Sequence, residues 1–246
     1  MSSSKPLTER YPELQSSDVH DAVGHLLSFA SVNPDKIWII GFSYSGAHAV
    51  KAASLDRRIK AVISINGFIR GSWLVGILVP DRASSDALIW EDRERRRTGG
   101  GEVGYLPLCK TAETGDNVLF PTQDSGEFYL GMQKAGLARG EEWRNEVTMQ
   151  SLLKMRRCNV MEDLKVLAPT SLLMIVDEVI LGCGEHWRAF EAAEAGGEIL
   201  REFVTVEGGH FAPLTEGKTL ERVIEHSLRF LRRAFDGKID EGVTIP

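Results

Sequence analysis

The chain has 246 residues, of which 43% are hydrophobic and 26% are charged, and its formal net charge is −6. This composition is typical of a folded globular protein, and the length suits one large domain. The negative net charge argues against nucleic acid or an anionic membrane surface as the main partner.

The cysteines and the apolar segments indicate which compartments and binding sites the sequence supports. The three cysteines are widely spaced and form neither a disulfide framework nor a metal-ligand motif. The first ten residues lack the apolar stretch of a secretory signal. No apolar run reaches the roughly 18–20 residues that span a bilayer. We therefore expect a cytoplasmic protein with no membrane contact, and the sequence implies neither a metal nor an organic cofactor.

The first third of the chain has the pattern of a β-α-β unit. After a polar tail over residues 1–15, apolar positions at helical spacing predict a helix over residues 19–32. The apolar, β-branched run 36–41 predicts a strand that is buried on both faces. An alanine-rich helix over 47–55 and a second apolar strand over 59–65 follow. Such a unit is parallel and right-handed.

The middle of the chain is less regular. Residues 70–165 predict a helical insertion or lid inside a single domain that spans residues 1–246, with one clear helical pattern over 143–157. Its aromatic side chains are expected either to pack in a core or to line a pocket. These residues are Trp73, Trp90, Tyr105, Phe128, Tyr129 and Trp143.

Regular alternation of strands and helices returns in the last third. Apolar runs predict strands over 171–176 and 202–206, with a helix over 187–195 between them. A clear amphipathic stripe predicts a final helix over 220–234. Helices that separate parallel strands are typical of an α/β fold.

A short motif joins the first predicted strand to the helix that follows it. It reads Gly41-Phe42-Ser43-Tyr44-Ser45-Gly46. A serine on a tight strand-to-helix turn, with small residues on either side, is typical of a nucleophile elbow. Ser43 is then the nucleophile, and the backbone N–H of Tyr44 is one donor to the oxyanion. Ser45 is the competing nucleophile, and a turn without catalytic function is the remaining alternative.

A serine hydroxyl needs a base to become a nucleophile. His210 follows the last predicted strand, and the small residues Gly208 and Gly209 present it. The order of serine before histidine is also that of hydrolases with a nucleophile elbow. His186 is a weaker candidate for a place near the site.

The third group should be a carboxylate that orients the histidine and stabilises its cation. Asp177 and Glu178 directly follow the third predicted strand. In enzymes of this kind the acid usually stands a few residues further on, where this chain has Ile180 and Leu181. Asp177, Glu178 and the absence of any acid therefore remain alternatives.

Several segments together resemble a known group of enzymes. The elbow and the stretch 55–62 resemble α/β hydrolases of the dienelactone-hydrolase-like and X-Pro-peptidase-like kinds. With the segments 120–125, 143–148, 168–174 and 208–211, the chain is more similar to the fungal polyketide transferase and thiohydrolase family. The resemblance runs from about residue 18 to residue 235, which is nearly the whole chain.

The resemblance implies an α/β-hydrolase fold, with a mostly parallel sheet flanked by helices and a helical lid. It also implies a serine enzyme that takes the acyl group of a polyketide-type ester or thioester and passes it to water or an alcohol. The substrate would be a small apolar acyl compound, free or bound to a carrier protein. Two alternatives are a non-hydrolytic condensation or cyclisation of a polyketide, and a relative that binds without catalysis.

One departure from the family concerns the start of the sheet. Family members carry further strands, and a loop with the second oxyanion donor, before the first helix predicted here. The resemblance therefore implies an N-terminally shortened sheet with an open strand edge. A homodimer or an exchanged segment could cover that edge.

Overall fold

The structure is a computed structural model that describes residues 9–79, 81–99, 101–115, 117–140, 143–178, 183–215 and 217–236. The chain divides into two compact units. Unit 1 combines the N-terminal segment up to Pro12 with residues 70–159. Unit 2 combines residues 13–69 with the chain from Val160 onward. The single domain over 1–246, with an insertion over 70–165, stays a prediction.

Unit 2 is built on a four-stranded sheet with the order β1-β2-β5-β6, in which every pair of neighbouring strands is parallel. The central strands consist of buried, mostly β-branched or aliphatic residues, as parallel strands covered on both faces require. This confirms the predicted α/β class. The strands are β1 (Trp38–Phe42), β2 (Ala61–Ile65), β5 (Ser171–Asp177) and β6 (Arg201–Val206).

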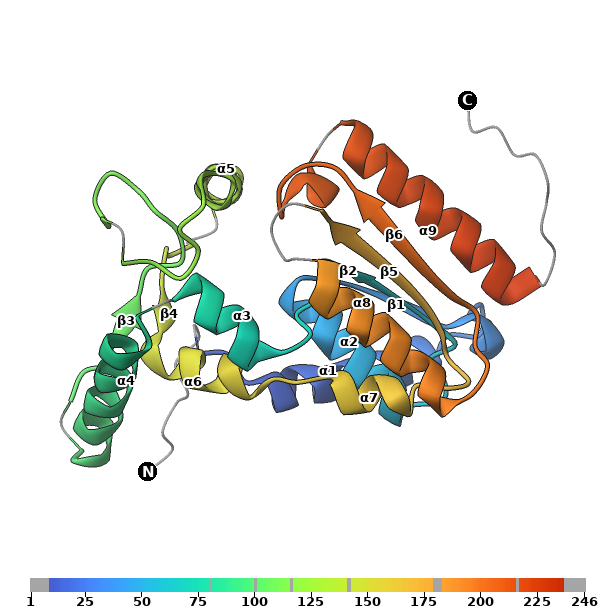
Figure 1. Cartoon of the computed structure of the whole chain (residues 1–246), viewed down its shortest axis with the longest axis horizontal. Helices are drawn as coiled ribbons and strands as arrows, with labels where there is room; N and C mark the ends of the chain where they lie inside the picture. Colours follow the sequence, from blue (N-terminus) through green and yellow to red (C-terminus); the bar gives the residue numbers. More distant parts are fainter. Residues whose placement is uncertain are drawn as a thin grey trace. The chain divides into compact units, whose positions relative to one another are not determined.

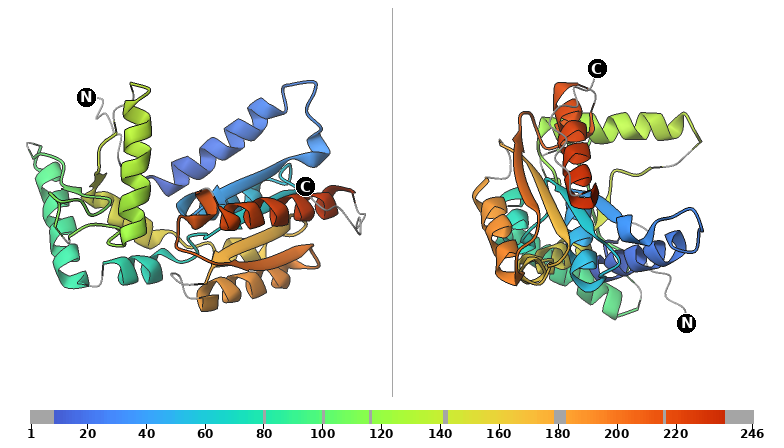
Figure 2. Two further views of the ribbon diagram at one scale, coloured as in Figure 1. Left: turned by 90° about the horizontal axis from the view of Figure 1, so that it is seen from above. Right: turned by 90° about the vertical axis from the view of Figure 1, so that its right-hand side faces the viewer.

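Helices cover both faces of this sheet (Figure 1). On one face lie α2 (Tyr44–Leu55) and α8 (Cys183–Ala192), and on the other lies α9 (Lys218–Asp236), which crosses over the strands (Figure 2). The short helix α7 (Met161–Lys165) contacts both α2 and α8. Val223 and Phe230 of α9 pack on Ile63 and Leu173 of the sheet to form one continuous core.

The first helix differs from its prediction. α1 (Pro12–Leu26) begins within the expected tail and ends before the predicted end at residue 32. Ser16 is a buried residue inside this helix, and its hydroxyl lies 3.4 Å from Nδ1 of His48. The tail is also shorter than predicted, because the buried carboxylate of Glu9 pairs with Arg96 and Lys154 within unit 1.

Unit 1 is mainly helical. The helices α3 (Gly71–Leu78), α4 (Arg82–Arg97) and α6 (Met149–Arg157) pack together. The two-residue strands β3 (Tyr105–Leu106) and β4 (Val147–Thr148) pair antiparallel, and α5 (Gln123–Leu137) completes the unit. Across the described ranges, none of the helices has both the length and the apolar character needed to cross a bilayer.

Candidate active site

Ser43 occupies the turn between β1 and α2, at the carboxyl end of the sheet. Its backbone has φ 53° and ψ −118°, a conformation with positive φ that non-glycine residues rarely adopt. Its N–H donates to the carbonyl of Ile65, and its carbonyl accepts from the N–H of Phe68. The strained conformation is therefore held by hydrogen bonds to the end of β2 and to the segment that follows it.

The small residues around Ser43 explain how this turn closes. A Cβ on Gly41 would lie 2.2 Å from the carbonyl oxygen of Ser45, so only glycine fits at that position. The Ser45 hydroxyl accepts from the Phe42 N–H at 2.9 Å and donates to the Phe42 carbonyl at 2.8 Å. Ser45, the competing nucleophile, thus uses its hydroxyl to lock the turn.

His210 lies beside this turn, in the loop after β6. Its Nε2 is 3.0 Å from Oγ of Ser43, which is hydrogen-bonding distance. The rings of Phe42 and Phe211 each lie 4.9 Å from the imidazole, measured between centroids. Gly208 has φ +107°, which lets the loop turn toward Ser43. The serine and histidine identified from the sequence are therefore in contact.

The two carboxylate candidates have different surroundings. Asp177 is the last residue of β5, and its side chain is fully buried. Glu178 is exposed at the turn that follows, and its N–H donates to the carbonyl of Val206. Ile180 and Leu181, the usual acid position, lie outside the described residues.

Tyr44 is the first residue of α2. Its N–H therefore belongs to the first turn of a helix, where the helix dipole is positive and favours negative charge. The Tyr44 ring packs edge-on against His48 and Phe68, with centroids 4.5 and 5.0 Å away. These contacts fix the start of the helix next to Ser43.

His186 bonds to the backbone and not to Ser43, so it is not placed as a second base. Its Nε2–H donates to the carbonyl of Gly67 at 2.8 Å, and the side chain is buried. Burial lowers the pKa of this imidazole, although the hydrogen bond to Gly67 and the charge of Glu185 act in the opposite direction. Through this hydrogen bond His186 supports the segment that follows β2.

Sequence reasoning missed one residue of this region, Asn66. It is the first residue after β2, it is buried, and it has φ 46°. Its side-chain amide contacts the backbone of both Asp177 and His210. A polar residue directly after a buried and mainly apolar strand, at the carboxyl end of a parallel sheet, is the signal that could have marked it as a candidate.

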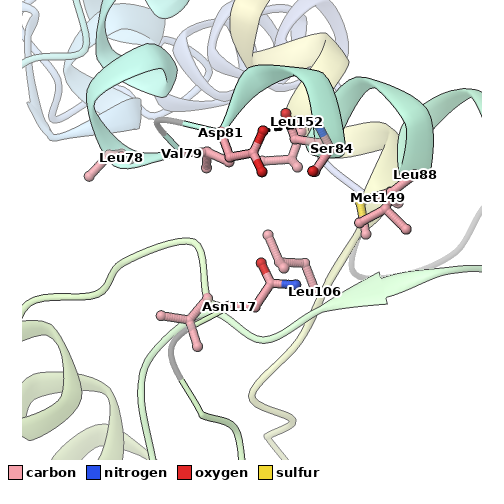
Figure 3. Close-up of a pocket in the computed structure, with 11 residues that line it drawn as sticks. Leu78, Val79, Asp81, Ser84, Leu88, Leu106, Asn117, Met149 and Leu152 are labelled. Carbon is pink, nitrogen blue, oxygen red and sulfur yellow. Dashed lines mark hydrogen bonds between the residues drawn. The ribbon is translucent and has the colours of Figure 1, made fainter.

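Unit 1 contains a pocket of about 280 Å³ (Figure 3). Side chains of α3, α4 and α6 form one wall, and Leu106 and Asn117 stand opposite them (Figure 3). The lining is mainly aliphatic, with Asp81, Ser84, Ser85 and Asn117 as polar members.

The aromatic residues predicted as pocket lining in the insertion are absent from this lining. Trp90 lines a second pocket in unit 1. Tyr129 stacks between Phe120 and Trp143, with ring centroids 6.0 and 5.9 Å away. For Tyr129 and Trp143, packing against other aromatic rings is therefore the observed arrangement. Within the described part of the chain, no group of three or more side chains is arranged to hold a metal ion.

No protein-family model matches the chain. Among curated proteins, the polyketide transferase af380 of Aspergillus fumigatus is 24% identical over 237 residues, which is 96% of this chain and 76% of that protein. The polyketide transferase claH of Penicillium crustosum is 30% identical over 77% of this chain and 62% of its own length. The thiohydrolase aneE of Aspergillus aculeatus is 27% identical over 95% of this chain and 73% of its own length.

Solved structures with the fold of this chain include two enzymes. The α/β hydrolase GrgF of Penicillium sp. sh18 superimposes with a TM-score of 0.69 at 22% identity, over 94% of this chain and 75% of that one. DcsB, solved with its substrate analogue, gives a TM-score of 0.71 at 24% identity, over 94% and 76%. The chain therefore has the α/β-hydrolase fold, and the curated proteins that it resembles are fungal polyketide transferases and thiohydrolases.

Proposed function

We propose that this protein is a serine-dependent acyl hydrolase or acyltransferase that acts on a polyketide-type ester or thioester in secondary metabolism. The observation that carries the proposal is the 3.0 Å contact between His210 Nε2 and Ser43 Oγ, at a serine whose backbone is held in a strained turn. A hydroxyl in contact with an imidazole is the arrangement that makes serine a nucleophile near neutral pH.

In the first half of the reaction, Ser43 Oγ attacks the acyl carbon of the substrate while His210 Nε2 takes the hydroxyl proton. The tetrahedral intermediate collapses, and the bond from the acyl carbon to sulfur or oxygen breaks. His210 returns the proton to the leaving thiol or alcohol. The acyl group is then an ester of Ser43.

In the second half, water or an acceptor alcohol gives its proton to His210 and attacks the Ser43 ester. Release of the acid or the new ester restores the Ser43 hydroxyl, so no oxidant, reductant or metal enters the balance. Water as acceptor gives a hydrolase, and an alcohol gives an acyltransferase.

Two further groups complete the proposed machinery. The N–H of Tyr44 donates to the oxyanion of each tetrahedral intermediate, a contribution worth about 10²–10³ in rate for one donor. Asp177 or Glu178 orients His210 and stabilises its cation. Burial at the end of β5 favours Asp177, because a carboxylate shielded from water interacts more strongly with an imidazolium.

The substrate class follows from the relatives, which are named polyketide transferases, thiohydrolases and an acyltransferase. We propose an apolar acyl substrate, free or carried as a thioester on a carrier protein. A purely non-hydrolytic condensation or cyclisation, and binding without catalysis, are not favoured by these relatives.

A fluorophosphonate probe, which reacts with activated serines, tests the proposal. The wild-type protein should be labelled on Ser43, as read by peptide mass spectrometry, and Ser43→Ala should not be labelled. Ser45→Ala separates the two candidate serines: it should still be labelled on Ser43, although more slowly, because the Ser45 hydroxyl closes the turn without being the nucleophile. Equal labelling of Ser43→Ala, or no labelling of the wild type, would exclude the covalent mechanism.

Short thioesters of polyketide acids then separate the two acceptors. The wild type should release free thiol, and mass spectrometry with and without added alcohols distinguishes the acid from a new ester. Ser43→Ala and His210→Ala should each reduce thiol release by about 10³-fold or more.

We also propose that a second copy of the chain covers the open edge of the sheet. β1 is an edge strand among the described strands, and Trp38 and Ile40 on it are 42% and 51% exposed. Exposed apolar residues on an unpaired strand edge favour association with another chain.

A further inference from the structure

The segment that follows β2 connects the parts of the site described above. Ile65, the last residue of β2, and Phe68 in this segment bond to the backbone of Ser43, and Gly67 accepts from His186. Asn66 stands between them, with its N–H donating to the carbonyl of Ile175 in β5 at 2.8 Å. The backbone of one short segment therefore contacts the elbow and β5 at once.

The Asn66 side chain extends this connection to the histidine. Its Oδ1 accepts from the N–H of Asp177 at 2.7 Å, and its Nδ2 donates to the carbonyl of His210 at 2.9 Å. The residue is 1% exposed, so water does not compete for these hydrogen bonds. One amide thus joins the end of β5 to the loop that carries the imidazole.

We propose that Asn66 is a positioning residue of the site, because its buried amide fixes the His210 loop to β5 and so sets the contact between His210 Nε2 and Ser43 Oγ. This inference deepens the proposed function and rests on it. Asn66 touches the backbone of His210, and through it acts on the imidazole.

The chemistry of asparagine explains why this residue type stands here. The position needs a side-chain acceptor for the Asp177 N–H and a donor for the His210 carbonyl, and an amide supplies both on one short side chain. The position also has φ 46°, a conformation that asparagine adopts more readily than most residues. Aspartate would keep the acceptor and lose the donor, and glycine would keep the backbone conformation and lose both.

Matched variants separate positioning from stability. Asn66→Gly removes both side-chain hydrogen bonds, and Asn66→Asp in its ionised form removes the donor to His210 and places a negative charge beside the His210 carbonyl. Thr170→Val is the control, because it removes another buried hydrogen bond, from the Thr170 hydroxyl to the Ile59 carbonyl, at the opposite end of the sheet. Fluorophosphonate labelling of Ser43 gives both the maximal inactivation rate and the probe concentration at half-maximal rate.

A displaced imidazole should lower the maximal rate about 100-fold in Asn66→Gly and Asn66→Asp, with little change in the half-maximal concentration. Thr170→Val should keep the wild-type rate. Wild-type rates in folded Asn66→Asp would overturn the proposal, even if Asn66→Gly fails to fold.

Failure of the proposed function gives a different result, because the wild type itself then shows no labelling at Ser43. In that case a crystal structure of Asn66→Asp still tests the positioning role. We expect the distance from His210 Nε2 to Ser43 Oγ to exceed hydrogen-bonding range in this variant. An unchanged distance would overturn the inference.

Discussion

Asp177 and Glu178 are adjacent in the chain and differ most in burial, which makes them the clearest test at the scale of single residues. Asp177→Asn keeps the shape of a buried side chain but cannot stabilise an imidazolium, so thioester turnover should fall by about 10³–10⁴-fold. Glu178→Gln alters an exposed side chain and should change turnover by less than about threefold. Steady-state kinetics with one thioester measures both.

The opposite pair of results would identify Glu178 as the orienting acid. Wild-type turnover in both variants would mean that neither residue supports His210. Both outcomes contradict the preference for Asp177 that its burial suggests.

Gly41 gives a second test at this scale. Gly41→Ala places a Cβ 2.2 Å from the Ser45 carbonyl oxygen, and the backbone of the elbow must move to relieve the clash. We expect destabilisation by about 2–3 kcal/mol, measured by denaturant unfolding, together with loss of Ser43 labelling. Gly131→Ala in α5 is the control, because a Cβ there meets no atom within 4 Å. It should leave stability equal or raise it by about 0.5–1 kcal/mol. A stable and fully labelled Gly41→Ala would contradict the geometry.

Much of the site could be predicted at the residue scale, because Ser43 and His210 stand in local patterns that short-range geometry imposes. The turn requires small neighbours, and the motif records them at Gly41 and Ser45. Asn66 could not be predicted in the same way. Its importance depends on Asp177 and His210, which lie 111 and 144 residues away in the chain. Its place at the end of a strand marks it only as a candidate, and no local pattern records these long-range contacts.

At the scale of elements, the strands and helices that a local sequence pattern marks were predicted, and those without such a pattern were missed. β2, β5 and β6 were placed within two residues of their observed starts, because long apolar runs mark buried strands. α5 escaped prediction because its sequence contains Gly126, Gly131 and Gly136, and glycine disfavours a helix interior. α3 escaped because eight residues are too few to define a helical period.

The turn between α2 and β2 makes an electrostatic prediction at this scale. Asp56, at the end of α2, accepts hydrogen bonds from the Arg58 guanidinium, and Arg58 also bonds to the carbonyl of His20 in α1. Hydrogen bonds from Arg58 outweigh the effect of burial and lower the pKa of Asp56 from 3.8 to about 2. The ionised carboxylate is therefore stabilised by the folded state.

A lowered pKa stabilises the fold above the unfolded-state value, and this stability is lost as the pH falls from about 4 toward 2. Asp56→Asn should cost about 2 kcal/mol at pH 7, and the difference from the wild type should shrink below pH 4. Urea unfolding at several pH values measures it. Arg58→Met should remove the same pH-dependent part of the free energy of unfolding. A cost that stays constant down to pH 2 would contradict the assignment.

At the scale of the whole molecule, the residues proposed for chemistry all belong to unit 2, whereas the pocket of Figure 3 belongs to unit 1. The contact between Ser43 and His210 is made within one unit, by loops that leave β1 and β6 at the carboxyl ends of the sheet. The acyl chemistry thus depends on the sheet.

The open edge of β1 gives the prediction at this scale. Trp38 and Ile40 share the face of the sheet that α9 covers, because they are in register with Ala61 and Ile63 of the core beneath that helix. Both side chains are exposed on an edge strand of the described sheet, so pairing of β1 with β1 of a second copy would satisfy the strand backbone and place cross-strand neighbours against them. We therefore expect a dimer at micromolar concentration by sedimentation equilibrium.

Ile40→Lys should shift the protein to monomer, because a charge on the strand edge opposes pairing. Leu55→Lys, which changes a 68% exposed residue on α2, should leave the dimer intact. A monomeric wild type would contradict the dimer, and dissociation by Leu55→Lys would place the interface elsewhere.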